Sequence, residues 1–353
     1  MNNHRKKKII TRFAPILGAS GIPHLVKPFF GGQGHILTFH RVIPDSNSAR
    51  IHNHESLEVS PAHLEAVIQF FAERNYQFYS LDQVARCLDQ GVFPDKFVSF
   101  TFDDGYQDVY QYAYPIFQKY EVPFAVYIST NFPDQTAILW WYMLEEFLLN
   151  SSELKFRWQG QGYAFSAAST PEKEAAFAQL RRLILQEKTQ ESQLGLLHTL
   201  FEERYPQLLE NANSMAMTWD EIIELSQDPL VSIGAHTQNH LPLSQISQAL
   251  LEEEVAGSKA QIEAYIQKRV DHFAYPFGKR TEASIREFQS VKSAGFKTAT
   301  TTRIGNIFPG HKAYLEALPR ISINRATNNK VLALQTSGLI SMVVNKGKQL
   351  ITD

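Results

Sequence analysis

The stretch KFVSFTFDDGYQD, residues Lys96 to Asp108, places two adjacent carboxylates after an apolar run and just before a glycine. Its first part is rich in aromatic and β-branched residues and predicts a buried strand. Gly105 permits a sharp break where that strand ends, so Asp103 and Asp104 could both point into a site above the sheet edge. Asp-Asp-Gly is also ordinary turn chemistry, and these three residues alone favour the turn.

Five further apolar runs are followed by polar or glycine residues and predict more buried parallel strands. Helix-length segments lie between the runs. One of them opens with Ser60 as an N-cap and Pro61 at the first helical position, and another follows Ser244. This alternation predicts a parallel sheet with helical crossovers, either a barrel or a wide open sheet. The five runs are HILTFH (35–40), FAVYIST (124–130), VSIGAH (231–236), HFAYPF (272–277) and FKTATTT (296–302).

Residues 134–216 interrupt the alternation with two helical patterns and a short polar segment between them. We interpret this stretch as a mainly helical insertion in one connection of a single domain over residues 35–330. A basic segment, residues 1–34, precedes this domain. A C-terminal helix or tail, residues 331–353, follows it.

Composition limits the classes of partner and of metal site. The 353 residues include 34 Lys and Arg against 36 Asp and Glu, so we expect no nucleic-acid partner. The single cysteine, Cys87, excludes an intramolecular disulfide and a cysteine-based zinc site. Any metal must therefore be held by histidine and carboxylate.

Cations crowd the start of the chain, where no acid precedes Asp45. The segment begins like a secretory leader, but charges and prolines interrupt its apolar part and no convincing cleavage site follows, so we interpret it as uncleaved. It could lie on an anionic membrane surface as a peripheral contact, or pack loosely on the domain. We expect the protein in the cytoplasm or on the cytoplasmic face of the membrane.

A second constellation, GAHTQNH, places His236 and His240 four residues apart after another predicted strand. A helical turn there would bring both imidazoles to one side. Two histidines with a carboxylate are a common way to hold zinc or a similar divalent ion. An isolated pair would more often be a capping and a surface histidine, but an Asp pair at the end of a strand in the same sheet favours the metal site.

TFDDGY, HTQNH and AYPFG resemble the first three signature motifs of the polysaccharide deacetylases, the NodB-homology domain of carbohydrate esterase family four. The resemblance runs from about His35 to Ile323, with the helical insertion as added material. It implies an α/β fold, a distorted (β/α) barrel of about seven parallel strands. It also implies metal-dependent removal of acetyl groups from an N-acetylated glycan, either a polysaccharide or a lipid-linked precursor.

Carried over by position, the resemblance implies that Asp104, His236 and His240 bind the metal. Zn²⁺ is expected first, with Co²⁺ or Ni²⁺ as alternatives. Asp103 would be the general base that takes a proton as metal-bound water attacks the amide carbonyl.

The resemblance also implies an oxyanion-binding backbone N–H in the loop Pro276, Phe277, Gly278, most plausibly that of Phe277. Tyr106 follows the motif glycine and could line the sugar site. Trp140, Trp141 and Tyr142 open the insertion and could pack against a sugar ring, although a tryptophan pair there is more often a core anchor.

The third motif departs from the family pattern. An arginine that orients the base usually stands two residues before the proline, and this chain has Ala274 there. Arg320 could supply the charge, because it lies between apolar residues where an unpaired cation would be costly. Lys279 and Arg280 are alternatives, and so is an ordinary salt bridge of Arg320.

The late Leu-x-His motif that supplies the general acid is also missing. His40 ends the first predicted strand, and some members of the family carry such a histidine ahead of the Asp pair, so His40 is the candidate acid. It could instead be capped by a backbone carbonyl. We expect His311 in a loop, and His52 and His54 on the surface.

The leading hypothesis is therefore a metal-dependent sugar N-deacetylase. An O-acetyl esterase or another amide hydrolase on the same scaffold is an alternative, as is a non-catalytic glycan-binding domain. The missing arginine and displaced acid favour the binding domain. Asp103 argues against it, because a binder needs no base beside a metal.

Overall fold

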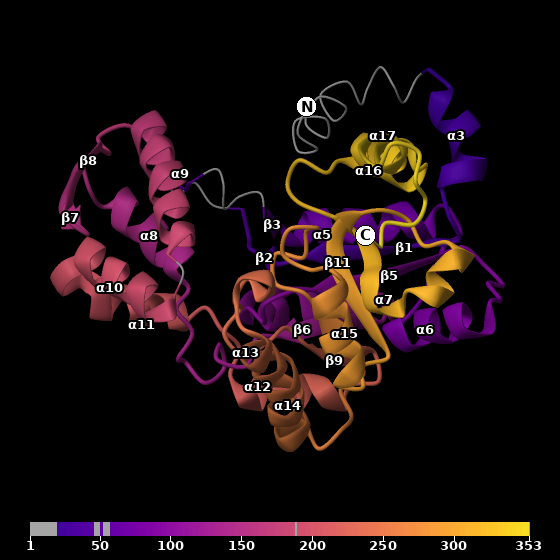
Figure 1. Ribbon diagram of the computed structural model, residues 1–353. Helices are drawn as coiled ribbons and strands as arrows, with labels where there is room; N and C mark the ends of the chain where they lie inside the picture. The colour runs from indigo at the N-terminus through magenta and orange to yellow at the C-terminus, as the bar shows by residue number, and fades with distance from the viewer. Residues whose placement is uncertain (1–19, 46–49, 52–56, 188, 353) are drawn as a thin grey trace.

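Seven parallel strands form a closed barrel in the computed structural model, which describes residues 20–45, 50–51, 57–187 and 189–352 (Figure 1). Strand β5 (Phe97–Phe102) pairs with strand β1 (Gly34–Phe39) over six residues, which closes the barrel. The predicted distorted (β/α) barrel is thereby confirmed. Around the barrel the order is β1 (Gly34–Phe39), β12 (Leu318–Ser322), β11 (Thr298–Ile304), β10 (His272–Ala274), β9 (Val231–Ala235), β6 (Phe124–Ile128) and β5 (Phe97–Phe102).

Each of the six apolar runs singled out in the sequence overlaps a barrel strand. The seventh strand, β12, was not predicted, because its sequence LPRIS carries a proline and an arginine. The short β4 (Gln77–Phe78) pairs with the start of β5 outside the barrel. Between the barrel and its helices lies an aromatic core, in which the rings of Phe117 and Phe124 stack at 4.3 Å.

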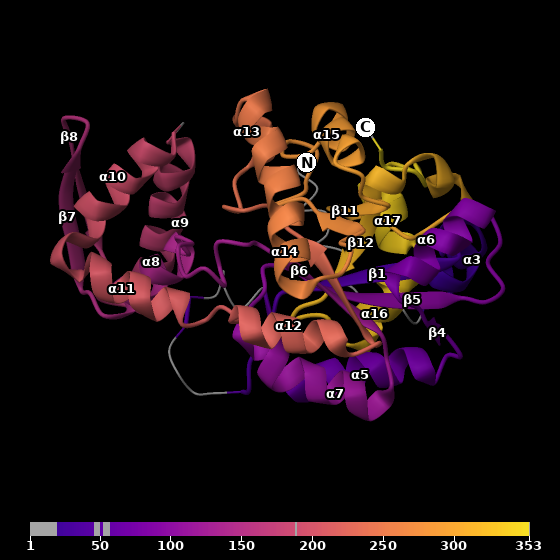
Figure 2. The same cartoon turned by 90° about the horizontal axis from the view of Figure 1, so that it is seen from below.

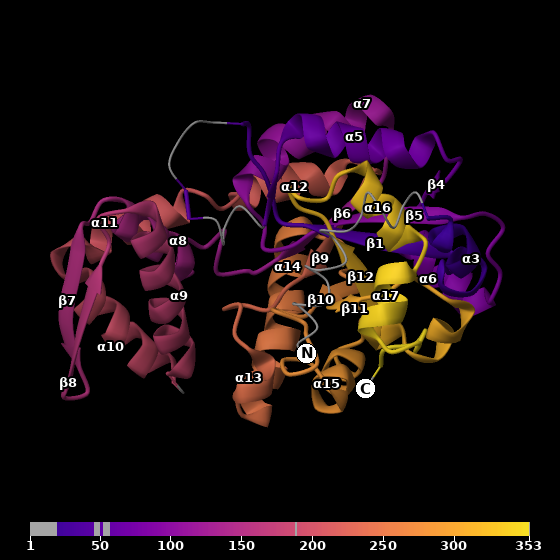
Figure 3. The ribbon, with the colours of Figure 1, turned by 90° about the horizontal axis from the view of Figure 1, so that it is seen from above.

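Helices cover the outside of the barrel, as Figures 1 and 3 show. The cap predicted at Ser60 is present, since its Oγ accepts a hydrogen bond from the N–H of His63 at 3.3 Å. The later helix begins at Gln248, with Ser247 as its N-cap, rather than directly after Ser244. The helices are α3 (Ile22–Phe30), α5 (Pro61–Ala72), α6 (Leu81–Gln90), α7 (Tyr114–Tyr120), α12 (Trp219–Gln227), α13 (Gln248–Glu252), α14 (Ser258–Ile266), α15 (Ile285–Ser293), α16 (Asn329–Thr336) and α17 (Leu339–Val344).

A group of elements between β6 and α12 stands beside the barrel and has its own apolar core (Figure 2). The polar segment expected between its helices forms an antiparallel hairpin, in which side chains alternate between buried and exposed along the first strand. We call this group the inserted subdomain. It comprises α8 (Trp140–Leu149), β7 (Glu153–Trp158), β8 (Gln161–Ser166), α9 (Thr170–Gln186), α10 (Gln190–Phe201) and α11 (Tyr205–Asn213).

Arg50 joins the inserted subdomain to the barrel side. Its Nε donates to Glu145 of α8 at 3.0 Å, and its Nη1 donates to Glu58 of β3 (Glu58–Val59) at 3.1 Å. Both carboxylates are buried, so the guanidinium balances charges that would be costly alone. This network fixes one face of the subdomain against the barrel.

The basic start of the chain, residues 1–19, and the histidines His52 and His54 lie outside the described residues. The expected membrane contact, the cytoplasmic location and the exposure of these histidines stay predictions. Among the residues that are described, no helix has the length and apolar character needed to cross a bilayer.

Candidate active site

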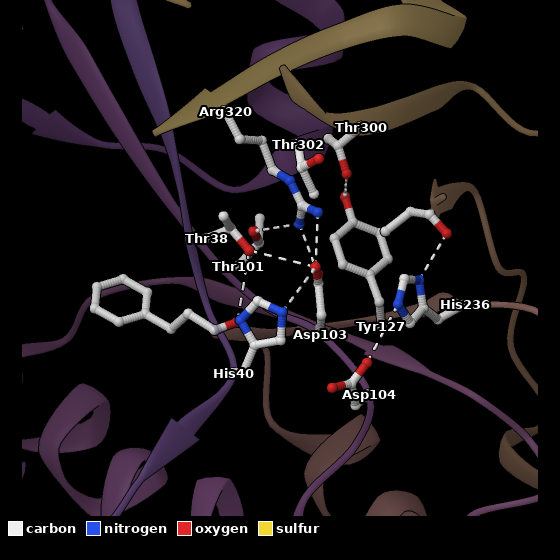
Figure 4. Close-up of polar contacts among 12 residues, drawn as sticks. Thr38, His40, Thr101, Asp103, Asp104, Tyr127, His236, Thr300, Thr302 and Arg320 are labelled. Atoms are coloured by element: carbon white, nitrogen blue, oxygen red, sulfur yellow. Dashed lines mark hydrogen bonds and ion pairs between the residues drawn. The ribbon is translucent and has the colours of Figure 1, made fainter. Parts of the chain in front are cut away.

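Asp103 lies at the carboxyl end of β5, where the barrel opens, with only 2% of its surface exposed. Arg320 of β12 binds both of its oxygens, through Nη1 at 2.6 Å and Nη2 at 2.7 Å (Figure 4). Burial is the largest influence and disfavours the charged carboxylate, but the charges of Arg320, His236 and His40 and the hydrogen bonds from Arg320 together outweigh it, so the pKa of Asp103 lies below its usual value. The geometry therefore keeps Asp103 ionised.

The Arg320 guanidinium makes two further hydrogen bonds besides those to Asp103. Its Nε donates to the carbonyl of Thr301 at 3.0 Å, and its Nη1 donates to Thr101 Oγ1 at 3.2 Å. Thr301 lies where the register of β11 against β12 shifts, between Thr300 and Ile304. The other two candidate cations, Lys279 and Arg280, are exposed. Of the three, the structure brings only Arg320 to Asp103.

Asp104 faces the two histidines of the second motif. Its Oδ1 lies 3.3 Å from His236 Nε2 and 3.4 Å from His240 Nε2, and it accepts no hydrogen bond from any described residue. One ligand atom from each of these three residues lies within 4.8 Å of the others. Burial would raise the pKa of Asp104, but the histidines hold it well below its usual value. Together the three side chains form a trio suited to a divalent cation.

The backbone fixes how each histidine points. His236 Nδ1 donates to the carbonyl of Ala274 at 2.7 Å, which leaves Nε2 facing Asp104. His240 follows a turn that is not helical, contrary to the sequence prediction, since Thr237 and His240 have φ values of 67° and 54°. The two rings still meet, with centroids 5.0 Å apart.

Several residues in and around the metal-binding trio have a strained backbone conformation. Asp104, Thr237, His240 and Phe277 all have positive φ, at 79°, 67°, 54° and 59°. Each such residue costs about 1–3 kcal/mol and persists only where its surroundings enforce it. The site is therefore held in shape by the rest of the fold.

Glu254 is a site residue that sequence reasoning missed. This fully buried carboxylate accepts from the backbone N–H groups of Gln238 and Asn239, each at 2.9 Å, and from Asn239 Nδ2 at 2.6 Å. It thus supports the turn that ends at His240. No local signal marks it, because it lies in the π-helix η4 (Glu253–Gly257) beyond a separate helix.

His40 follows β1 on the other side of Asp103. Its Nε2 lies 4.0 Å from Asp103 Oδ2, and its side chain is 19% exposed (Figure 4). Burial lowers the pKa of His40, and the charges of Asp104 and Asp103 oppose this. A lowered pKa makes the imidazolium a stronger proton donor. The other histidine considered, His311, is buried in a 3₁₀ turn and away from the site.

The loop after β10 reaches the trio from the side. The Phe277 ring lies 5.0 Å from the His240 ring, and no described residue accepts a hydrogen bond from the Phe277 N–H. Pro276 and Gly278 are buried, and the Gly278 carbonyl accepts from the N–H of Thr302 at 3.0 Å. Thr302 Oγ1 also donates to the Phe277 carbonyl. The bulged strand that holds Arg320 thus holds this loop as well.

Two candidate sugar contacts, Tyr106 and Trp140, are buried, and for Trp140 this is the core position that the sequence favoured. Tyr106 has no exposed surface, because its ring packs between Phe132 and Tyr142, so it cannot touch a sugar in this arrangement. Trp140 is 6% exposed and belongs to the core of the inserted subdomain. Its neighbour Trp141 is only half-buried and lies 5.5 Å from the His240 ring.

Comparison with known proteins identifies the family. The family model for polysaccharide deacetylase matches residues 90–167 and 196–299, just over half of the chain. This chain belongs to the polysaccharide deacetylase family. The matched ranges include Asp103, Asp104, His236 and His240, and the gap between them falls in the inserted subdomain.

Three known deacetylases are similar to parts or most of the chain. Poly-β-1,6-N-acetyl-D-glucosamine N-deacetylase of Staphylococcus aureus is 32% identical over 86 residues, which is 24% of this chain and 29% of that protein. The deacetylase PplD of Streptococcus pyogenes has a similar fold, with a TM-score of 0.56, 20% identity, and coverage of 86% of this chain and 97% of that one. A de-N-acetylase from Aggregatibacter actinomycetemcomitans gives a TM-score of 0.56 at 15% identity, covering 86% and 99%.

Proposed function

We propose that this polysaccharide deacetylase hydrolyses the N-acetyl groups of hexosamine units in a glycan and depends on a divalent metal held by Asp104, His236 and His240. One observation carries the proposal. A carboxylate clamped in its ionised form, Asp103, lies directly beside a trio of metal-binding side chains. A proton acceptor at that place suits the attack of water on an acetyl carbonyl.

The trio fits a metal by its chemistry. Asp104 Oδ1 is buried and accepts no hydrogen bond from a described residue, which is costly unless a cation balances it. Two imidazoles and one carboxylate suit zinc, with cobalt or nickel as alternatives. A divalent ion bound there would polarise the carbonyl and lower the pKa of water.

The remaining site residues have separate roles in the hydrolysis. Asp103 accepts the proton of the attacking water, and Arg320 keeps it ionised and oriented. The free N–H of Phe277 is available to the oxygen on which negative charge develops. His40, on the opposite side of Asp103, is placed to protonate the departing amine.

His40 favours an amide over an ester as the substrate. An alkoxide leaving group departs with less help than an amine, so an esterase has less need of a proton donor beside the base. The Asp103–Arg320 pair likewise disfavours a non-catalytic glycan-binding domain, because it contributes nothing to holding a metal or a sugar. The names of the Staphylococcus and Aggregatibacter relatives, both N-deacetylases, support the same choice.

Acetate release tests the proposal. The protein is stripped of metal with a chelator and then assayed with zinc, cobalt or nickel on β-1,4- and β-1,6-linked tetramers of N-acetylglucosamine and on O-acetylated xylan. We expect acetate from at least one tetramer only after metal is restored, and none from Asp103→Asn. Release from xylan alone would indicate an esterase, and binding of a tetramer without release would indicate a glycan-binding domain.

A further inference from the structure

His40 lies between two strands that belong to different sheets. The strand before it, β1, is part of the barrel, whereas β2 (Arg41–Val42) pairs with β3 in a separate two-stranded sheet. Among the described residues, none makes a hydrogen bond with the His40 ring, which lies 4.0 Å from Asp103 Oδ2. The ring of His236, by contrast, is held by the carbonyl of Ala274. The position of the His40 ring therefore depends on how the backbone on either side of it is fixed.

The segment that carries the base holds the chain on both sides of His40. On one side, the N–H of Asp103 donates to the carbonyl that directly precedes His40, at 3.0 Å. On the other side, Asp108 accepts from the backbone N–H of Val42 at 2.8 Å and from Arg41 Nε at 2.6 Å. Asp103 and Asp108 belong to the same short stretch of sequence. The geometry of this one stretch therefore sets where His40 lies relative to the base.

Arg41 and Asp108 form a buried ion pair, with side chains that are 12% and 7% exposed. The guanidinium also lies 4.9 Å from the ring centroids of Tyr106 and Tyr142, the second of which belongs to α8 of the inserted subdomain. The cost of desolvation offsets most of the attraction in a buried pair, so stability alone is a poor reason for having one. Its location directly after His40 favours a role in geometry.

From these contacts we infer that Asp108, through Arg41 and the N–H of Val42, is a positioning residue that holds His40 beside Asp103. The inference rests on the proposed function and extends it, because it concerns the residue that protonates the departing amine. Metal binding and the attack of water should not depend on Asp108. Only the transfer of a proton to the leaving group should.

Rates on two substrates test this role. Asp108→Asn keeps an oxygen for the N–H of Val42 but leaves Arg41 without its counter-charge. For the tetramer of N-acetylglucosamine that the zinc-loaded parent protein deacetylates, we expect kcat to fall at least about tenfold at unchanged KM and zinc content, because an amine leaves slowly without a proton. Hydrolysis of p-nitrophenyl acetate, whose leaving group needs no proton, should fall far less. Equal losses on both substrates would overturn the inference, because a general structural defect spares neither.

A double-variant cycle determines whether Asp108 acts through His40. His40→Gln already removes the proton donor, so the addition of Asp108→Asn should cause no further loss of kcat on the tetramer. A further loss as large as the one that Asp108→Asn causes in the parent protein would overturn the inference, because Asp108 would then act independently of His40.

A second variant replaces Asp108→Asn if that protein does not fold, since it leaves a buried cation unpaired. The double variant Arg41→Met/Asp108→Asn carries neither charge and keeps the acceptor for the N–H of Val42. It should show the same selective loss on the tetramer. Full activity on the tetramer would overturn the inference.

Asp228→Asn is the matched control. Asp228 has the same kind of partners, since it accepts from the N–H of Leu230 at 2.8 Å and from the hydroxyl of Tyr114 at 2.9 Å. It lies before the start of β9, at the opposite end of that strand from His236. Both rates should therefore stay at the values of the parent protein.

Failure of the inference and failure of the proposed function give different results. In a crystal structure of Asp108→Asn, His40 Nε2 should lie farther than 4.0 Å from Asp103 Oδ2. If the parent protein releases no acetate from either tetramer but His40 is displaced in the variant, the positioning role stands and the deacetylase proposal falls. If the parent protein is active and the variant keeps both the tetramer rate and the position of His40, the function stands and the inference falls.

Discussion

Arg320 binds both carboxylate oxygens of Asp103, at 2.6 and 2.7 Å, and both side chains are buried. Adjacent carboxylates in a buried site would normally force one of them to take up a proton. Here the guanidinium balances the charge of Asp103, while Asp104 faces the two histidines at a site suited to a cation. The pair can therefore perform two different tasks.

Arg320→Ala should leave a buried carboxylate without its partner. We expect a loss of about 3–5 kcal/mol in the free energy of unfolding, measured by urea titration. The pKa of Asp103 should rise, so the acid limb of the kcat/KM profile should move to higher pH, while metal content stays the same. Arg320→Lys restores the positive charge but cannot bind both carboxylate oxygens in the same way. Its stability and its acid limb should therefore lie between those of the parent protein and Arg320→Ala. An unmoved acid limb in Arg320→Ala would contradict the role of the clamp.

Asp103→Asn should lower kcat roughly 10³-fold, because the amide cannot accept the proton of the attacking water. Its metal content, measured by elemental analysis, should equal that of the parent protein. Asp104→Asn, His236→Ala and His240→Ala should instead lose the metal. Full metal occupancy in any of these three would remove that residue from the ligand set.

His40→Gln should distinguish the two kinds of leaving group. Deacetylation of N-acetylated oligomers should fall by about 10²-fold or more, since the amine can no longer be protonated. Hydrolysis of p-nitrophenyl acetate, whose leaving group needs no proton, should continue at close to the parent rate. Equal losses on both substrates would assign His40 a structural part instead.

Glu254→Gln should loosen the turn that carries His240. The substituted amide offers one fewer acceptor to Gln238 and Asn239, so we expect zinc affinity to fall by 10- to 100-fold, the usual effect of removing support behind a metal ligand. Competition with a chromophoric chelator measures it directly. Glu253→Gln, at an exposed neighbouring position, is the control and should bind zinc normally. Unchanged zinc affinity in the Glu254 variant would contradict this role.

His35 should make the fold sensitive to acid. Burial lowers its pKa from 6.5 to about 3, while Asn306 and Tyr76 bind its ring nitrogens. Below pH 6.5 the unfolded chain therefore takes up a proton that the folded chain does not, and this group should cost stability at up to about 1.4 kcal/mol per pH unit until pH approaches 3. Urea unfolding between pH 7 and 5 should show a shallower decline for His35→Gln. Parallel declines would exclude His35 as the source.

Much of the barrel could be predicted because its strands are buried on both faces. Such strands produce uninterrupted apolar runs, as in residues 97–102 and 124–130. Strand β12 was not predicted, because it contains a charged residue, Arg320, whose partner Asp103 lies far away in the sequence. The hairpin over residues 153–166 was not predicted, because one of its faces is exposed and polar.

The site divides in the same way. Asp103, Asp104, His236 and His240 could be predicted as a group because strand ends bring short motifs together. Glu254 could not be, because its relation to His240 depends on how a separate helical segment packs against the turn. The prediction that Tyr106 lines the sugar site was wrong for a similar reason. Its ring is buried by Phe132 and Tyr142, which come later in the chain than the Asp-Asp-Gly motif.

Ala274 carries a consequence for how related sequences are judged. It belongs to the same buried cluster as Tyr127, and the Arg320 guanidinium lies 5.8 Å above the ring of that tyrosine. The cation therefore reaches the base from another strand, through Arg320 of β12. A survey that required arginine at position 274 would discard this chain as inactive. A survey that accepted any buried cation within reach of the first aspartate would keep it.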